Sequence, residues 1–245
     1  MAKPLSRLGL LAASLAVGLA LSGCNTMPSQ VGADIAQQLP TMLGPAKHYD
    51  VHVGGSIFDL ARGKVSSVHI VGEDVTLSPG LTVSRFDALA SDIHADTRTQ
   101  AVKSIGSTTF CASLTQADLD GYLRAQRAAA YARGARITLG ARRLTYSDAI
   151  VVLGAHAPFS VTGVLAPEAG APSKLDFVPS RASLLHIGVP MALVDRACAS
   201  ENPVVDLSAI KYPVAVSGSS VSNHVLTISG TVDLQSLGAA PEAKS

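Results

Sequence analysis

Histidine and carboxylate side chains alternate along two short segments, and these are the first residues that could carry chemistry. His48, Asp50 and His52 fall on one face of a predicted strand, because successive side chains of a strand point to opposite sides. The same alternation recurs at Asp92, His94 and Asp96. Either set could hold a metal, but neither offers a third and fourth ligand at a recognisable spacing. Alternating polar residues are more often the solvent face of a strand, so we expect no metal and no cofactor.

The sequence lacks the local motifs that build the common catalytic sites. It contains no Gly-x-Ser-x-Gly, no His-Glu-x-x-His, no phosphate-cradling glycine-rich loop and no Cys-x-x-Cys. No hydroxyl is singled out as a nucleophile with a base and an orienting acid. We therefore expect a protein that is not an enzyme. The alternative is a hydrolase, which would place His94, His156 or His186 beside Asp and Ser in an exposed cleft.

The N-terminus has the layout of an export signal that ends at a cysteine. Lys3 and Arg7 precede an apolar run from Leu8 to Leu21, which is shorter than the roughly 20 residues of a membrane-spanning helix. The run ends in Leu-Ser-Gly-Cys, which resembles a bacterial lipobox. Small residues let a peptidase grip the extended chain, and the thiol of Cys24 can carry a diacylglyceryl group. We predict a signal peptide over 1–23 and a lipid anchor at Cys24; the alternative is an ordinary secretory signal with a chance cysteine.

Charge and composition exclude a polyelectrolyte partner. Without residues 1–23 the chain keeps 17 Lys and Arg against 18 Asp and Glu, so no nucleic-acid partner is expected. The dense basic group is Arg124, Arg127, Arg133, Arg136, Arg142 and Arg143. Basic residues near the end of a helix complement its dipole, which explains part of this group; contact with an anionic surface is the alternative. The chain has no Trp, so its core must be aliphatic.

Two cysteines remain beside Cys24. Export places Cys111 and Cys198 in an oxidising compartment if the host is diderm, so a disulfide between them is one expectation. Two buried thiols that pack as small apolar residues are the other.

Helices are predicted where apolar residues recur at helical spacing between capping residues. We expect a helix capped by Asp34 and kinked or ended by Pro40, a short helix between Ser56 and Gly63, a longer helix from Ser113 or Thr115 to Gly134, and a helix opened by Pro190. A polar tether, residues 24–30, precedes the first of these helices.

Strands are predicted where apolar and polar residues alternate, which is a period of two residues. They are expected over residues 49–53, 68–70, 75–77, 81–83, 92–96, 102–110, 136–139, 149–153, 159–165, 174–178, 182–187, 212–216 and 226–234. Turns are expected at residues 78–80, at 166–172 and around Gly218 and Ser219. We find no repeat and no linker, which predicts a single α+β domain over 31–236 and a disordered tail over 237–245.

Several segments of the sequence resemble those of one family of exported proteins. Residues 54–65, GGSIFDLARGKV, are similar to the short helix and strand entry near the start of the LmeA-type phospholipid-binding proteins. Residues 113–119 resemble their helix opening, and the segments 202–214 and 226–230 resemble their ending. The resemblance implies a TULIP-like fold, in which a long curved antiparallel sheet wraps one or more amphipathic helices and leaves an apolar groove for acyl chains. The lipobox departs from members that carry an ordinary signal or membrane anchor.

On this resemblance we expect an envelope lipoprotein that binds phospholipid acyl chains without catalysis and holds or transfers them. The expected groove residues are Leu81, Val83, Ile93, Phe110, Leu119, Leu123, Met191 and Val194. The expected partners are phospholipid and the membrane that holds Cys24, facing the periplasm or the exterior. Asn25 is not the aspartate linked to inner-membrane retention, which favours the outer membrane in a diderm host. The alternatives are an envelope scaffold without a lipid cavity and an envelope hydrolase.

Overall fold

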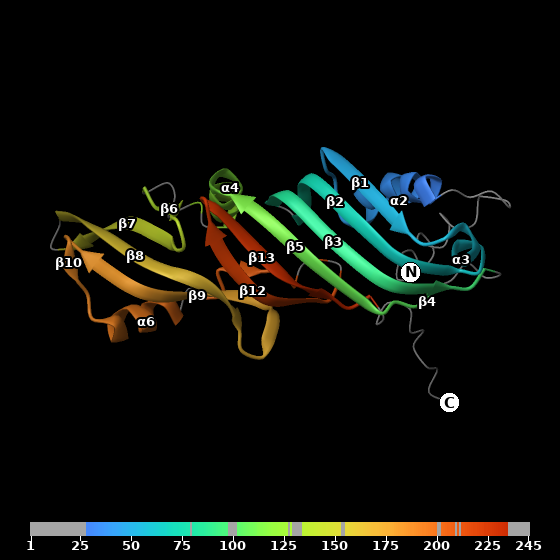
Figure 1. Cartoon of the computed structure of the whole chain (residues 1–245). Coiled ribbons are helices and arrows are strands. Elements are labelled where there is room, and N and C mark those ends of the chain that lie inside the picture. The colour runs from blue at the N-terminus through green and yellow to red at the C-terminus, as the bar shows by residue number, and fades with distance from the viewer. Residues whose placement is uncertain are drawn as a thin grey trace, which may run out of the picture. The chain divides into compact units, whose positions relative to one another are not determined.

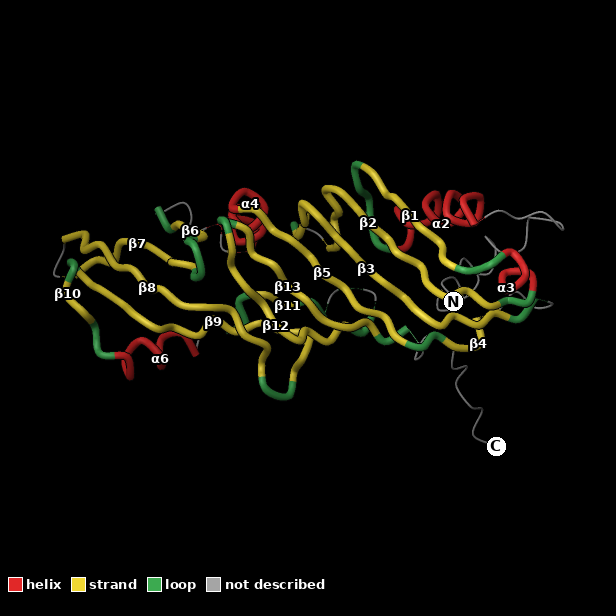
Figure 2. The backbone as a smooth tube through the Cα atoms, in the orientation of Figure 1, coloured by secondary structure: helices red, strands yellow, loops and turns green. Residues whose placement is uncertain are grey.

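The computed structural model of the chain describes residues 28–234, apart from 79, 98–101, 127, 129–133, 153–154, 200–201, 209 and 211. Strands dominate this region, with few helices beside them (Figure 1). The strands form curved, unclosed and largely antiparallel sheets (Figure 2). The sheet-rich class is therefore confirmed, whereas a sheet that wraps a helix stays a prediction. The predicted signal 1–23, Cys24 and the tail 237–245 lie outside the described residues, as do Arg127 and Arg133.

The helices are α2 (Pro28–Met42), α3 (Ile57–Ala61), α4 (Gln116–Gln126) and α6 (Met191–Ala199). One sheet of the described chain has the strand order β1-β2-β3-β5-β13-β12, with β4 paired to β3; its strands are β1 (His48–Gly54), β2 (Lys64–Ser78), β3 (Leu81–Ala95), β4 (Val102–Ser104), β5 (Ser107–Thr115), β12 (Val214–Ser222) and β13 (Val225–Val232). The other has the order β10-β9-β8-β7-β6, with β11 paired to β9; its strands are β6 (Arg136–Leu139), β7 (Leu144–Val152), β8 (Ala155–Glu168), β9 (Ala171–Leu184), β10 (Ile187–Gly188) and β11 (Val205–Asp206).

The contacts of the chain group into two compact units. The first unit holds the chain up to Val75, the segment Phe86–Phe110 and the chain from Thr231. The second unit holds Thr76–Arg85 and Cys111–Gly230. A single domain over residues 31–236 therefore stays a prediction, and each unit is described by itself.

Helix α2 of the first unit begins earlier than its sequence pattern indicates. It starts at Pro28 and not at the predicted cap Asp34, so residues 28–30 of the expected tether are helical. Proline is favoured in the first turn because it has no N–H that would need a partner there. Pro40 lies within the last turn and does not end the helix, which continues to Met42. The apolar spacing itself is confirmed, since Ile35 and Leu39 are buried.

Helix α3 has the ends that its sequence predicts. The Oγ of Ser56 accepts a hydrogen bond from the backbone N–H of Asp59, 3.1 Å away. Leu60 points inward and is buried. Gly63 follows the helix with a φ of 75°, and a Cβ on it would lie 2.1 Å from the carbonyl oxygen of Ala95. Only glycine fits this position, because both the conformation and the close approach exclude a side chain.

Helix α4 in the second unit is capped by Thr115, the last residue of strand β5, whereas the other candidate, Ser113, lies two residues farther back within that strand. Asp118 Oδ2 accepts hydrogen bonds from the backbone N–H and the Oγ1 of Thr115, at 2.7 and 2.8 Å. The Oγ1 of Thr115 in turn accepts from the backbone N–H of Asp118 at 3.3 Å. This reciprocal pairing fixes the beginning of α4.

Two turns of the second unit correct the sequence predictions. The loop expected over 166–172 is a tight turn, because β8 runs to Glu168 and β9 starts at Ala171, with a φ of 85° at Gly170. The turn expected around Gly218 and Ser219 is part of strand β12. The chain reverses instead at Asn223 and His224, which both have positive φ, as a two-residue hairpin turn requires. The separate strands expected over 174–178 and 182–187 are joined, since β9 spans 171–184.

The core is aliphatic, as predicted, and within the described residues it contains no buried charged or polar side chain. Its most buried large side chains include Leu39 and Ile93 in the first unit and Leu119 and Leu139 in the second. No disulfide joins Cys111 to Cys198, which are both half-buried. The two thiols stand on β5 and α6, and α6 packs against β9 of the other sheet. None of the described helices has the length and hydropathy that a membrane span requires.

Candidate functional site: a cleft between helix α2 and strand β1

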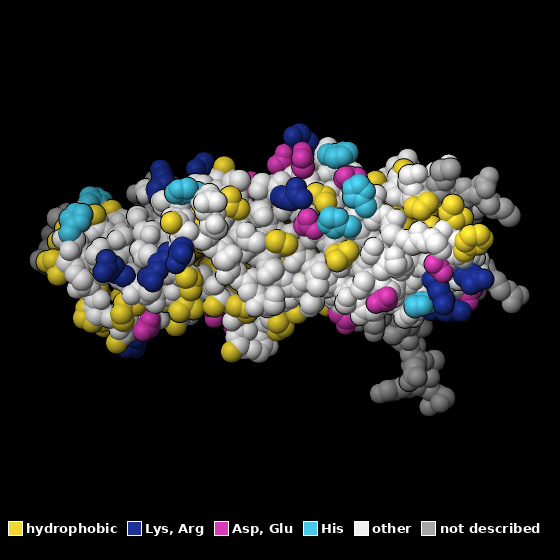
Figure 3. Space-filling view, viewed as in Figure 1, with side chains coloured by type: hydrophobic (Ala, Val, Ile, Leu, Met, Phe, Trp, Pro, Cys, Tyr) yellow, Lys and Arg dark blue, Asp and Glu magenta, His cyan; other side chains and the backbone are white. Residues whose placement is uncertain are grey.

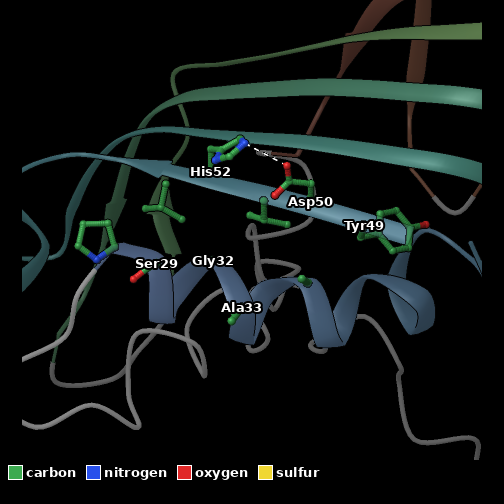
Figure 4. Close-up of a pocket in the computed structure, with 10 residues that line it drawn as sticks. Ser29, Gly32, Ala33, Tyr49, Asp50 and His52 are labelled. Carbon is green, nitrogen blue, oxygen red and sulfur yellow. Dashed lines mark ion pairs between the residues drawn. The ribbon is translucent and has the colours of Figure 1, made fainter. Parts of the chain in front are cut away.

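The first unit contains a cleft between α2 and β1 with a volume of about 590 Å³ (Figure 4). This volume lies within the range of roughly 300 to 1,000 Å³ that is usual for small-molecule sites. The lining residues are Pro28, Ser29, Gly32, Ala33 and Ala36 of α2, and Tyr49, Asp50, Val51, His52 and Val53 of β1. One wall is therefore a single helix and the other a single strand.

Small residues on α2 allow the helix to approach the strand closely. A Cβ placed on Gly32 would lie 2.6 Å from the carbonyl oxygen of Val51 and 3.9 Å from the Val53 side chain. Real Cβ atoms do not come this close to a backbone oxygen, so only glycine permits this contact. Ala36 follows one helical turn later on the same wall of the cleft. Gly32 thus sets the spacing between the two walls.

Strand β1 presents a different face to each side. Val51 and Val53 are half-buried and alternate with the exposed Asp50 and His52. Figure 4 shows the side chains of Asp50 and His52 on the side of β1 away from α2. The two valines and the alanines of α2 supply the apolar part of a lining that also includes Ser29, Asp50 and His52.

Tyr49 is the first residue of β1 that lines the cleft, and its side chain is neutral and hydrogen-bonded. Its ring is 8% exposed, and its hydroxyl donates a hydrogen bond to the carbonyl oxygen of Gly44 at 2.9 Å. Burial raises the pKa of Tyr49 to about 12, because the charged phenolate is disfavoured away from water. Tyr49 therefore stays protonated at any physiological pH and adds no charge to the cleft.

The predicted polar face of β1 is confirmed, and it continues onto β2 and β3. His48, Asp50 and His52 are all exposed, and the Nε2 of His52 lies 3.1 Å from the Oδ2 of Asp50. His52 stacks on His69, its cross-strand partner, with ring centroids 6.3 Å apart. The Nε2 of His69 lies 2.7 Å from the Oδ1 of Asp87. Histidine side chains gather beside acidic and basic ones over β1 and β2 in Figure 3.

This face does not assemble a metal centre. The described residues contain no group of three His, Cys, Asp or Glu side chains that could hold a metal ion. Each of the two stacked histidines is directed at its own carboxylate and not at a shared point. The arrangement is a surface ladder of alternating histidine and carboxylate groups.

The histidines that a hydrolase would need do not meet in the cleft. His94 is exposed, and its Nδ1 lies 3.5 Å from the Oγ of Ser104. The neighbouring carboxylate of Asp96 is 2.9 Å from the Nζ of Lys103. His156 and His186 are exposed residues of the second unit, outside the cleft. Among the residues drawn in Figure 4, no histidine is directed toward the hydroxyl of Ser29.

The eight predicted groove residues are buried or half-buried, but none of them lines this cleft. Ile93 and Phe110 belong to the first unit, and the other six to the second: Leu81, Val83, Leu119, Leu123, Met191 and Val194. The start of β3 and helix α4 do lie close together, since a Cβ on Gly80 would be 3.3 Å from that of Ala125. The groove formed by these residues stays a prediction.

The α2–β1 cleft is not apparent from the apolar spacing, which predicts a helix that begins at Asp34. The signal in the sequence is the pair of small residues Gly32 and Ala36, four positions apart in the segment that precedes β1. Such a pair marks a helix face that another backbone can approach.

Comparison with known proteins identifies a family. A family model described as LmeA-like phospholipid-binding matches residues 27–231, which include the whole of the second unit, much of the first and every residue that lines the cleft. No curated protein and no solved structure matches the chain.

Proposed function

Because the chain belongs to the LmeA-like phospholipid-binding family, we propose that it binds the acyl chains of phospholipids in the α2–β1 cleft and holds or transfers them without catalysis. The family membership carries this proposal. The cleft supports it with a suitable volume and a partly apolar lining in the matched region.

The physical basis is the transfer of hydrocarbon out of water. Each methylene buried from water contributes roughly 0.8 kcal/mol, so a segment of about eight methylenes would contribute about 6 kcal/mol before the cost of ordering the chain. Contacts of this kind need no specific polar partner. Val51, Val53 and Ala36 are the side chains that would meet the hydrocarbon, and Ser29 is the hydroxyl nearest to the beginning of α2.

The proposal includes a lipid anchor at Cys24 and a location in the cell envelope. Cys24 lies four residues before Pro28, the first residue of α2. Four residues span at most about 14 Å when fully extended. An acyl group on Cys24 would therefore keep the cleft close to the membrane surface, where phospholipid is available. In a diderm host we favour the outer membrane.

Mass spectrometry of the purified protein tests lipid binding directly. The chain from Asn25 onward contains every described residue and lacks both the signal and the anchor cysteine. We expect it to carry phospholipid after purification without detergent, or to take up a fluorescent phospholipid analogue afterwards. A chain that emerges free of lipid and takes up no analogue would contradict the proposal.

Substitutions on α2 test the location. Ala36→Phe places a phenyl group in the cleft and should weaken analogue binding about tenfold, because displacing about two methylenes costs roughly 1.6 kcal/mol. Gln37→Phe adds the same group at the exposed neighbouring position and should leave binding unchanged. If both variants bound the analogue as tightly as the parent chain, the cleft would be excluded as the binding site. The groove predicted around Leu119 and Leu123 would then be the next candidate.

A further inference from the structure

The first unit carries an exposed apolar pair on helix α3. Phe58 is 78% exposed and Ile57 is 53% exposed, and Phe58 is the most exposed large apolar side chain of the described chain. Adjacent exposed apolar side chains of this size are typical of surfaces that contact a membrane or another protein. We infer that Ile57 and Phe58 insert into the surface of a phospholipid bilayer and orient the first unit on it.

The local structure holds this pair in a fixed position. Ser56 caps the helix through Asp59, and Leu60 anchors the opposite side in the core. Gly63, which contacts the Ala95 backbone, ends the helix against β3. Ile57 and Phe58 are thus presented outward by a short, capped helix and not by a flexible loop.

Basic side chains adjoin the apolar pair. Arg62 and Lys64 are exposed, and among the described residues neither forms an ion pair. The carboxylate of Asp59 is occupied by the Ser56 hydroxyl, 2.6 Å away, and Lys103 is paired with Asp96. Figure 3 shows basic and acidic side chains together at this end of the unit, with apolar side chains nearby. Two available cations beside inserted apolar groups suit a surface that contains anionic lipid headgroups.

A lipid anchor before α2 would bring the end of the first unit that carries α3 to a membrane. Pro28 and Val53 line one cleft, and Val53 lies four residues before Ile57, so α3 and the beginning of α2 share one end of the first unit (Figure 1). A lipid anchor at Cys24 would attach at that end through four residues. This step rests on the proposed anchor. It also places the Pro28 end of the cleft next to the bilayer, from which an acyl chain could enter.

Single-tryptophan variants test the insertion, because the chain has no Trp of its own. Phe58→Trp and Leu89→Trp are made in the chain that begins at Asn25, so that no anchor contributes. Leu89 is the matched control, since it is 44% exposed on β3 of the same unit. With vesicles of phosphatidylcholine and phosphatidylglycerol, emission from the Phe58→Trp variant is expected to shift to shorter wavelength and to be quenched by brominated acyl chains. Emission from the Leu89→Trp variant is expected not to change.

Vesicle sedimentation then measures how much the apolar side chain and the two basic side chains each contribute to membrane binding. Phe58→Ser should weaken vesicle binding about tenfold or more, since a large apolar side chain no longer leaves water. Replacing both Arg62 and Lys64 by Ser should weaken binding roughly tenfold on vesicles with phosphatidylglycerol and have little effect on phosphatidylcholine alone. Leu89→Ser should bind like the parent chain.

Three results would overturn the inference: emission from the Phe58→Trp variant unchanged by any vesicle, equal loss of binding in Phe58→Ser and Leu89→Ser, or an emission shift that follows protein concentration and not vesicles. The last would assign the pair to a second copy of the chain. Uptake of a soluble fluorescent fatty acid separates this inference from the proposed function, because Phe58→Ser should retain it. If the parent chain bound vesicles but took up no fluorescent fatty acid, the result would contradict the proposed function and leave the membrane insertion intact.

Discussion

The ring of Tyr49 covers Gly72, its cross-strand partner on β2. A Cβ on Gly72 would lie 2.9 Å from the Cε1 of Tyr49 and 2.5 Å from a methyl carbon of Val75. The aromatic side chain therefore occupies the space that a side chain at position 72 would need. Glycine in a strand is normally unfavourable, and a ring packed over it offsets the missing side chain. This pair fixes the register of β1 on β2 at one end of the cleft.

Gly72→Ala should destabilise the protein by about 1 to 3 kcal/mol, because the added methyl group overpacks a filled site. Denaturation by urea gives the change in the free energy of unfolding. Gly218→Ala in strand β12 is the matched control, since no atom lies within 4 Å of its Cβ position. We expect the control to change stability by less than about 0.5 kcal/mol. Equal effects at the two positions would show that the Tyr49 contact is unimportant.

Gly32→Ala should lower both stability and lipid uptake. Alanine is the better helix former, but its methyl group would clash with the Val51 carbonyl oxygen, so α2 must move away from β1. We expect a net loss of about 1 to 3 kcal/mol on unfolding and weaker binding of the phospholipid analogue. Gly121→Ala in α4, where the Cβ position is open, should instead gain roughly 0.5 to 1 kcal/mol. A Gly32→Ala protein with parental stability would refute the close approach.

The protein should lose stability in alkaline solution as its buried tyrosines ionise. Burial raises the pKa of Tyr49 and that of Tyr212 to about 12. In the unfolded chain a phenol ionises near pH 10. The folded state therefore binds more protons between pH 10 and about 12, so the free energy of unfolding falls as pH rises through this window.

Tyr49→Phe should remove part of this pH dependence, on the order of 1 to 2 kcal/mol. Below the window the variant should be less stable than the parent by about 1 kcal/mol, because the hydrogen bond to Gly44 is lost. Urea denaturation at a series of pH values measures both effects, and Tyr212→Phe provides an independent comparison in the second unit. If Tyr49→Phe retains the full alkaline slope, its hydroxyl does not titrate as a buried group.

Local chemistry was the part of this structure that the sequence could predict. Ser56 and Gly63 define α3 because a cap and a left-handed glycine act within a few residues. The Asn223–His224 turn was missed because neither residue is glycine, whereas nearby Gly218 offered a stronger turn signal but lies within an extended strand. Asn202 shows the limit of local patterns. Its side chain donates to the carbonyl of Phe177 at 3.3 Å and accepts from the N–H of Phe177 at 2.9 Å, across 25 positions of sequence.

The candidate site was harder to predict than the fold class for the same reason. The cleft depends on a contact between the Gly32 backbone and the Val51 carbonyl, and no periodicity reports which carbonyl a glycine approaches. The family was predicted correctly because the resemblance rests on several sequence segments spread along the chain. It indicated the chemistry of the ligand but not which helix and strand would form a cleft.

Helix α2 has a second consequence through its place beside β1. In the described chain β1 is the terminal strand of its sheet, and an uncovered terminal strand is a template on which further copies can add by backbone pairing. Helix α2 packs against this strand and its Gly32 approaches the carbonyl oxygen of Val51, so we expect a chain whose α2 is detached to be prone to polymerise by pairing of β1 strands. The residues that shape the cleft would thereby also oppose the formation of fibres by strand pairing.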